Sequence, residues 1–273
     1  MERYLCLNMV IDSTETSDAL VAFLSAEGFE GFEEEEGRLK AYRPDGEWNR
    51  QEIFDELDLR SIGYTLEEIE KTNWNQLWES NFEPVVVDDF VGIRADFHAP
   101  IKGVEWELVV TPKMSFGTGH HATTRLMIQQ MRHSIKPGDR ILDFGTGTGV
   151  LAILAKKMGA AEVVGIDIED WSIENAIDNA WINEVSGISF HCSDRIEHAG
   201  PFNCILANIN RNILLDHMGR IGAVLATGGM ILLSGILEED LSVMDKALGE
   251  VGLKRIDYTQ EKGWICIQAI QYQ

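Results

Sequence analysis

From about residue 119 onward, apolar strand-like runs alternate with segments of helical periodicity. Runs such as 163–166 and 230–233 are continuously apolar, which is typical of strands covered on both faces. This alternation predicts a doubly wound, mainly parallel seven-stranded α/β sheet of Rossmann-like type. The runs 252–258 and 263–271 indicate a closing hairpin, so we expect an antiparallel last strand. The other strands are expected at 140–143, 162–166, 188–192, 203–207 and 229–234, and the helices at 120–133, 149–158, 170–182, 210–222 and 239–249.

The first 70 residues follow a different pattern, in the order β-α-β-β-α-β, which predicts a small α+β domain of ferredoxin-like type. We expect a linker helix at 71–84, with Trp74 and Trp78 on one face, and a larger domain at 85–273 that starts with short strands at 85–87, 91–95 and 106–110. The strands of the small domain are expected at 4–11, 29–33, 38–43 and 64–69, and its helices at 17–27 and 50–59.

The chain is strongly acidic, with a formal net charge of −22. Residues 1–70 hold 19 acidic and 6 basic side chains and so carry much of this excess. Such a balance disfavours binding to nucleic acid phosphates or to an anionic membrane surface, because both require basic patches. The run 33–36 of four glutamates is expected to be a solvated turn, with docking of a basic substrate as the alternative.

Targeting and cysteine signals indicate a cytoplasmic protein. The longest apolar stretch, 228–237, is about half the roughly 20 residues that a membrane-spanning helix needs. The N-terminus does not have the pattern of a secretory signal. The cysteines at 6, 192, 204 and 266 are scattered without a C-x-x-C pair, so we expect reduced thiols and no zinc site.

A glycine-rich turn, D-F-G-T-G-T-G at 143–149, follows the strand expected at 140–143. Such a turn lies beyond the carboxyl ends of parallel strands, where open α/β sheets bind ligands, and glycine lets backbone approach a ligand closely. A dinucleotide fingerprint requires glycine or alanine where this chain has Val150, which disfavours an NAD-linked oxidoreductase. The next strand ends in Asp167, whose carboxylate can accept hydrogen bonds from both hydroxyls of a ribose.

The pattern D-x-G-x-G-x-G resembles the first motif of the class I S-adenosylmethionine-dependent methyltransferases. Further stretches make the resemblance more specific. They are N-W at 73–74, M-S-F-G-T-G-H-H-A-T-T at 114–124, V-G-I-D at 164–167, A-N-I at 207–209 and L-S-G-I-L at 233–237. With the glycine turn, these stretches resemble the ribosomal protein L11 methyltransferases, the PrmA family. The resemblance covers most of residues 70–240, whereas the first 70 residues match mainly by size and element order.

This resemblance implies S-adenosylmethionine as cofactor and ribosomal protein L11 as partner. Phe116 and Thr124 would line the methionine end of the cofactor, Gly145 would pack against it, Asp167 would hold its ribose, and Asn208 would sit where methyl donor and acceptor amine meet. The small domain would recognise the protein substrate, and the reaction would methylate lysine side chains and the N-terminal amine. The expected cofactor-binding residues are Phe116, Thr124, Asp143, Gly145, Gly147, Asp167 and Asn208, with Asn208 also catalytic and no metal bound.

Some positions depart from the family pattern. The family usually has Thr-His-Pro-Thr-Thr where this chain has H-H-A-T-T at 120–124, and it commonly has Cys or Ser where Thr146 and Thr148 stand. Loss of the proline at Ala122 is expected to loosen the loop over the cofactor. Asn210 replaces the usual leucine and bears on how the substrate is positioned.

The residues after Asn208 favour an alkyl amine as acceptor. Methyltransferases of base amines and glutamine amides typically have Pro-Pro-Tyr/Phe there, and this chain has Ile209 and Asn210. Asn208 can accept an amine N–H through its carbonyl, and its alternative role is to cap the following helix. Other interpretations are methylation of another protein or of RNA, a non-catalytic S-adenosylmethionine-binding module, and an NAD-linked oxidoreductase.

Overall fold

The computed structural model describes residues 3–11, 13–29, 31–35, 37–44, 46, 48–70, 82–111, 116–196 and 200–271. The chain divides into two compact units, Met1–Asn81 and Phe82–Gln273. Most of the predicted linker helix, including Trp74 and Trp78, lies outside the described residues. Its last part, 82–84, has no regular secondary structure.

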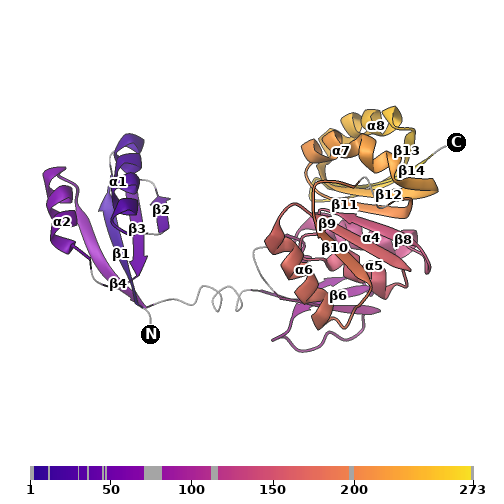
Figure 1. Ribbon diagram of the computed structural model, residues 1–273, viewed down its shortest axis with the longest axis horizontal. Helices are drawn as coiled ribbons and strands as arrows, with labels where there is room; N and C mark the ends of the chain where they lie inside the picture. The colour runs from indigo at the N-terminus through magenta and orange to yellow at the C-terminus, as the bar shows by residue number, and fades with distance from the viewer. Residues whose placement is uncertain are drawn as a thin grey trace. The chain divides into compact units, whose positions relative to one another are not determined.

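The described residues of the small unit form a four-stranded sheet and two helices (Figure 1). Its strands are antiparallel in the order β2-β3-β1-β4, which confirms the predicted ferredoxin-like arrangement. Alternate residues of β1 and β3 pack against both helices, because a strand presents every second side chain to the same face. The elements are β1 (Arg3–Val10), α1 (Thr14–Ala26), β2 (Gly31–Glu35), β3 (Arg38–Pro44), α2 (Arg50–Leu59) and β4 (Tyr64–Glu70).

The run of glutamates differs from the prediction of a turn, because β2 continues through Glu35. Glu33 accepts a hydrogen bond from the Tyr42 hydroxyl at 2.7 Å, and Glu34 accepts one from the Ser17 hydroxyl at 2.9 Å. These contacts tie the carboxylates of an edge strand to its neighbour β3 and to α1, which propensity alone does not predict.

The large unit is built on a seven-stranded sheet in the order β10-β9-β8-β11-β12-β14-β13. Within it β14 is antiparallel to β12 and β13, and the five strands from β10 to β12 are parallel, as predicted. The strands are β8 (Arg140–Phe144), β9 (Glu162–Asp167), β10 (Ile188–Cys192), β11 (Phe202–Asn208), β12 (Leu225–Leu237), β13 (Leu253–Glu261) and β14 (Trp264–Gln271).

Helices cover both faces of this sheet, as Figure 1 shows. Successive residues of one strand enter different cores: Ile141 packs with α4 and α5, whereas Leu142 packs with α7 and α8. A small sheet of β5 (Val85–Val87), β6 (Val91–Ala95) and β7 (Trp106–Val110) joins the first of these cores. The helices are α4 (Ala122–Ser134), α5 (Val150–Lys157), α6 (Asp170–Ile182), α7 (Arg211–Ala223), the 3-10 turn η1 (Glu238–Asp240) and α8 (Leu241–Glu250).

The closing hairpin is longer than predicted. The sequence predicts that the polar run 259–262 separates the two strands, but β13 continues through Glu261. Lys262 and Gly263, with φ of 51° and 82°, make the turn, and positive φ at both central residues is typical of tight hairpins. Within the described ranges, none of the helices combines the length and apolar character needed to cross a membrane.

Candidate active site

A cavity of about 460 Å³ opens where the central parallel strands of the large unit end. It is lined by Phe116, His121, Thr123, Phe144, Gly145, Gly147, Ile166, Asp167, Ile168, Glu169, Trp171, Ser172, Ser193, Asn208, Ile209, Asn210, Ile213, Gly235 and Trp264. Five of the expected cofactor residues are among these. The other two, Thr124 and Asp143, are buried and do not line the cavity. The position is the one where open α/β sheets bind ligands.

The glycine turn between β8 and α5 is fixed by contacts with neighbouring strand ends. The N–H groups of Gly145 and Thr146 both donate to the Ile166 carbonyl, at 2.8 and 2.9 Å. Gly145 has a φ of 79°, and a Cβ there would lie 2.2 Å from the Ile209 Cγ2 atom. Gly235, with a φ of 85°, lies on the other side of Ile209, and its Cβ would be 2.3 Å from the Ile209 carbonyl oxygen. Glycine at 145 and 235 therefore lets the turn after β8 and the last part of β12 approach Ile209, which follows β11.

Asp167, at the end of β9, lines the cavity with an oriented carboxylate. Its Oδ2 atom accepts a hydrogen bond from the Gly147 N–H at 2.9 Å, and its Oδ1 atom accepts one from the Glu169 N–H at 3.1 Å. Each carboxylate oxygen has a second acceptor site, so the group can also accept from two vicinal hydroxyls. The geometry fits the ribose role expected for this residue.

Asp143 lies beneath the glycine turn. Its Oδ2 atom accepts hydrogen bonds from the Thr146 hydroxyl at 2.7 Å and from the Ala152 N–H at 3.1 Å. It thereby connects the turn to the first residues of α5. Burial raises the pKa of Asp143 from an ordinary 3.8 to about 7, and the charge of Asp167 acts in the same direction.

Asn208 ends β11 with its side chain 8% exposed and directed by Thr124. The Nδ2 group donates to the Thr124 hydroxyl at 3.3 Å, which leaves the Oδ1 atom as the free end of the amide. Among the described residues that buried oxygen has no hydrogen-bond partner. A buried acceptor without a partner is costly, so an N–H donor from a ligand would stabilise this arrangement.

The alternative role of Asn208 as a helix cap is wrong. The N-cap of α7 is Asn210, whose side chain accepts a hydrogen bond from the Ile213 N–H at 3.1 Å. The residue that departs from the family pattern thus fills the capping role, since asparagine is a favoured N-cap and leucine is not. Asn208 is left to face the cavity.

The comparison with family models agrees with the site geometry. Residues 6–271 match the model described as "Ribosomal protein L11 methyltransferase (PrmA)". The chain belongs to the ribosomal protein L11 methyltransferase family. The match includes nearly all of the small unit, where the sequence motifs alone carried little specificity.

Individual members of this family align along most of their length. The ribosomal protein L11 methyltransferase of Bacteroides fragilis is 36% identical over 266 residues, covering 94% of this chain and 95% of that protein. The Porphyromonas gingivalis protein of the same name is 38% identical over 259 residues, covering 92% and 89%. A crystal structure of the ribosomal protein L11 methylase from Lactobacillus delbrueckii subsp. bulgaricus superposes with a TM-score of 0.64 at 29% identity, covering 70% of this chain and 100% of that one. The resemblance inferred from the motifs is therefore confirmed.

An aromatic wall, formed by Phe116, His121 and Trp264, borders the cavity. The Phe116 and His121 ring centroids are 5.5 Å apart, and those of His121 and Trp264 are 4.8 Å apart in an edge-on arrangement. Sequence reasoning missed His121 as a lining residue and Trp264 altogether. Trp264 comes from the closing hairpin, more than 100 residues from the motif loop, and only the sheet order brings it there.

The segment around residue 120, which departs from the PrmA pattern at His120 and Ala122, is held by several structural contacts. His121 is the N-cap of α4, and its Nδ1 atom accepts from the Thr123 N–H at 3.3 Å. Ala122, in place of the family proline, is the first helical residue. The guanidinium of Arg125 donates to the carbonyls of Gly119 and His120 and forms an ion pair with Glu261. Among the described residues no cluster of His, Cys, Asp and Glu side chains could hold a metal ion.

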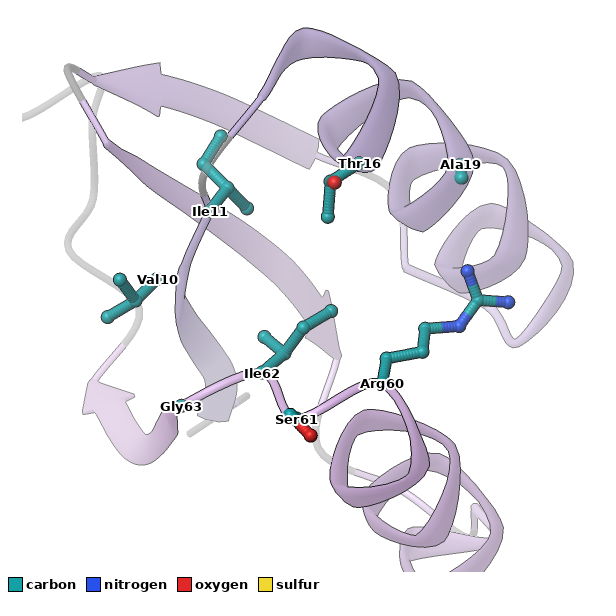
Figure 2. Close-up of a pocket in the computed structure, with 8 residues that line it drawn as sticks. All are labelled: Val10, Ile11, Thr16, Ala19, Arg60, Ser61, Ile62 and Gly63. Atoms are coloured by element: carbon teal, nitrogen blue, oxygen red, sulfur yellow. The ribbon is translucent and has the colours of Figure 1, made fainter.

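A second cavity, of about 560 Å³, lies on the small unit (Figure 2). It is formed where β1 ends, beside the first turns of α1 and the loop that leads from α2 to β4. Its lining mixes apolar and hydroxyl side chains, and in Figure 2 the Arg60 side chain extends from the end of α2 toward Ala19. No motif marked this surface in the sequence.

Proposed function

We propose that this protein transfers methyl groups from S-adenosylmethionine to amino groups of ribosomal protein L11, namely lysine side chains and the N-terminal amine. The observation that carries the proposal is the buried Oδ1 atom of Asn208, an acceptor without a partner among the described residues, in a cavity that also presents the Asp167 carboxylate. Family membership supports the same reaction.

The residues of the cavity fit the cofactor. Asp167 would hold the ribose hydroxyls, and the backbone at Gly145 and Gly147 would pack beside the cofactor. Phe116 would lie at the methionine end, and Thr124 would act there through Asn208. When bound, S-adenosylmethionine supplies a methyl group that its sulfonium already activates.

The protein's own contribution would be orientation of the amine. Asn208 accepts an N–H of the acceptor amine through Oδ1, and Thr124 keeps the amide from rotating. The nitrogen lone pair is thereby directed at the methyl group, and such alignment can supply much of a rate enhancement. A lysine amine, with an unperturbed pKa near 10.4, must first lose a proton. We assign that step to water and to desolvation on entry into the cavity.

The small unit would bind the protein substrate, free or on the large ribosomal subunit, in the cytoplasm. Its acidic excess suits a basic ribosomal protein and disfavours RNA. Its cavity between β1 and α1 offers a place for a side chain of that partner. The linker between the units would let the small one reposition the substrate.

The test is incubation of the purified protein with radiolabelled S-adenosylmethionine and a mixture of purified ribosomal proteins and rRNA. We expect label on ribosomal protein L11 alone, in amines identified by mass spectrometry. Label on rRNA would favour an RNA methyltransferase, and binding of S-adenosylmethionine without transfer would favour a non-catalytic module. A thermal shift with NAD but not S-adenosylmethionine would favour an oxidoreductase.

A further inference from the structure

Three buried asparagines lie four residues apart along α6. They are Asn175, Asn179 and the C-cap residue Asn183, so their side chains share one face of the helix. Asparagine is a weak helix former, and a buried amide is costly unless hydrogen bonds satisfy it. Packing alone therefore does not explain why this face of the helix is polar.

Two of these amides bind the backbone at β7, an edge strand of the small sheet in the described part of the chain. The Oδ1 atom of Asn183 accepts from the Val109 N–H at 2.9 Å, and its Nδ2 group donates to the Val109 carbonyl at 2.6 Å. The Oδ1 atom of Asn179 accepts from the Thr111 N–H at 2.7 Å. Four helical residues rise about 6 Å and two strand residues about 6.7 Å, so the amides match alternate residues of the strand.

Asn179 makes a second contact that Asn183 does not share. Its Nδ2 group donates to the Thr148 carbonyl, in the glycine turn, at 2.8 Å. The Thr148 N–H in turn donates to the Phe116 carbonyl at 3.0 Å. Because Thr111 requires the oxygen of the amide and Thr148 requires its NH₂ group, the two partners fix the amide in one orientation. One side chain thus joins the end of β7 to the glycine turn and, through Thr148, to Phe116.

The elements that Asn179 joins are in close contact. Gly149, at the end of the glycine turn, has a φ of 77°, and a Cβ there would lie 2.9 Å from the Ala176 Cβ atom on α6. A Cβ on Gly147 would lie 2.4 Å from the Phe116 carbonyl oxygen. Such packing leaves little room for independent adjustment, so a displacement of Thr148 would also displace Phe116.

We propose that Asn179 is a positioning residue for methyl transfer. By holding the Thr148 carbonyl, it determines where Phe116 lies relative to the glycine turn, and hence how the methionine end of the cofactor is placed. The proposal rests on the proposed use of S-adenosylmethionine. Asn179 is buried and does not line the cavity, so it acts only through Thr148 and Phe116. The ribose end is assigned instead to Asp167.

The experiment compares two ligands, S-adenosylhomocysteine and 5′-methylthioadenosine, which lacks the amino-acid end, by titration calorimetry. Asn179→Ala is expected to weaken binding of S-adenosylhomocysteine about 10-fold and to lower kcat by a similar factor, because small misplacements of reacting groups are costly. Binding of 5′-methylthioadenosine should change by less than about 2-fold, since the ribose contacts remain. Asn179→Ser leaves a hydroxyl and room for a bridging water, so we expect a shift of about 3-fold in the same direction, measurable even if the alanine variant does not fold.

Asn183→Ala is the matched control. It removes the contacts with Val109 from the same helix face, but its amide does not reach the glycine turn. It should lower the Tm as the changes at Asn179 do, and it should bind both ligands as the unmodified protein does.

The outcomes separate the two proposals. If the unmodified protein binds neither ligand, the proposed function and the positioning role both fail. If it binds both, and the variants of Asn179 bind them equally well, only the positioning role is overturned. Equal losses for the two ligands, or the same selective loss in Asn183→Ala, would also overturn it, because a general loss of structure would then explain the result. A loss confined to S-adenosylhomocysteine and to the variants of Asn179 would support it.

Discussion

Replacement of Asp143 by asparagine should remove a pH-dependent loss of stability from the large unit. In the unfolded chain this carboxyl ionises near 3.8, but in the folded protein burial delays ionisation to about pH 7. The folded state therefore binds the extra proton between these values, and the free energy of unfolding falls as pH rises through this window. The difference between these two pKa values corresponds to about 4 kcal/mol in total.

The part of this free-energy change that can be measured lies above pH 5.5, away from the isoelectric point near 4.6. Between pH 5.5 and pH 8 the unmodified protein should lose about 2 kcal/mol relative to Asp143→Asn. The asparagine keeps the acceptor oxygen for Thr146 and Ala152, and the cost of its buried NH₂ group does not depend on pH. The comparison therefore uses the change with pH rather than the stability at one pH.

Calorimetric unfolding of both proteins at several pH values provides the measurement. The transition of the large unit is the one that S-adenosylhomocysteine moves to higher temperature, because a ligand stabilises the unit that binds it. Asp194→Asn is the control, since that carboxylate is 67% exposed, and it should follow the unmodified protein at every pH. A constant difference between Asp143→Asn and the unmodified protein would refute the raised pKa and the linkage derived from it.

Three further predictions concern the two cavities. Gly145→Ala should destabilise the large unit by about 3 kcal/mol and weaken cofactor binding, because the added Cβ would lie 2.2 Å from Ile209 and the backbone there is left-handed. Thermal unfolding measures this loss of stability, and an unchanged Tm would contradict the prediction. Asn208→Ala should lower kcat by about 100-fold with little change in cofactor Kd, and equal losses in both would point to a structural role. Ala19→Trp should fill the small-unit cavity and lower kcat/KM for the protein substrate with unchanged cofactor Kd, whereas Ser25→Trp, exposed on the same helix, should have no effect.

The sequence predicted the architecture because each element carries its own periodic signal. The sheet of the large unit, its antiparallel last strand and the order of the small unit all follow from local pattern and turn residues. The predicted strand boundaries were wrong where polar residues lie in strands, as at 33–35 and 259–261. There, pairing with a neighbouring strand outweighs the weak strand propensity of polar residues.

The site was predictable where it lies on the motifs and not elsewhere. Asp167 and Asn208 end strands and Gly145 directly follows one, so their position at one edge of the sheet could be inferred. The difference between Thr123, which lines the cavity, and Thr124, which orients Asn208, depends on how α4 is rotated. Trp264 reaches the site only through the order of the strands, which local sequence does not encode.

The position of Ile209 between two glycines has a consequence for how this protein can change over evolutionary time. The obstacle to a side chain at Gly145 is a methyl group of Ile209, so a smaller residue at 209 would remove the clash first. The obstacle at Gly235 is the Ile209 backbone carbonyl, which no substitution at 209 removes. A smaller residue at 209 therefore relieves the steric part of the cost at Gly145 but leaves the strain of its left-handed backbone, whereas it relieves neither part at Gly235. Pairwise mutational scans should show epistasis with position 209 only for Gly145.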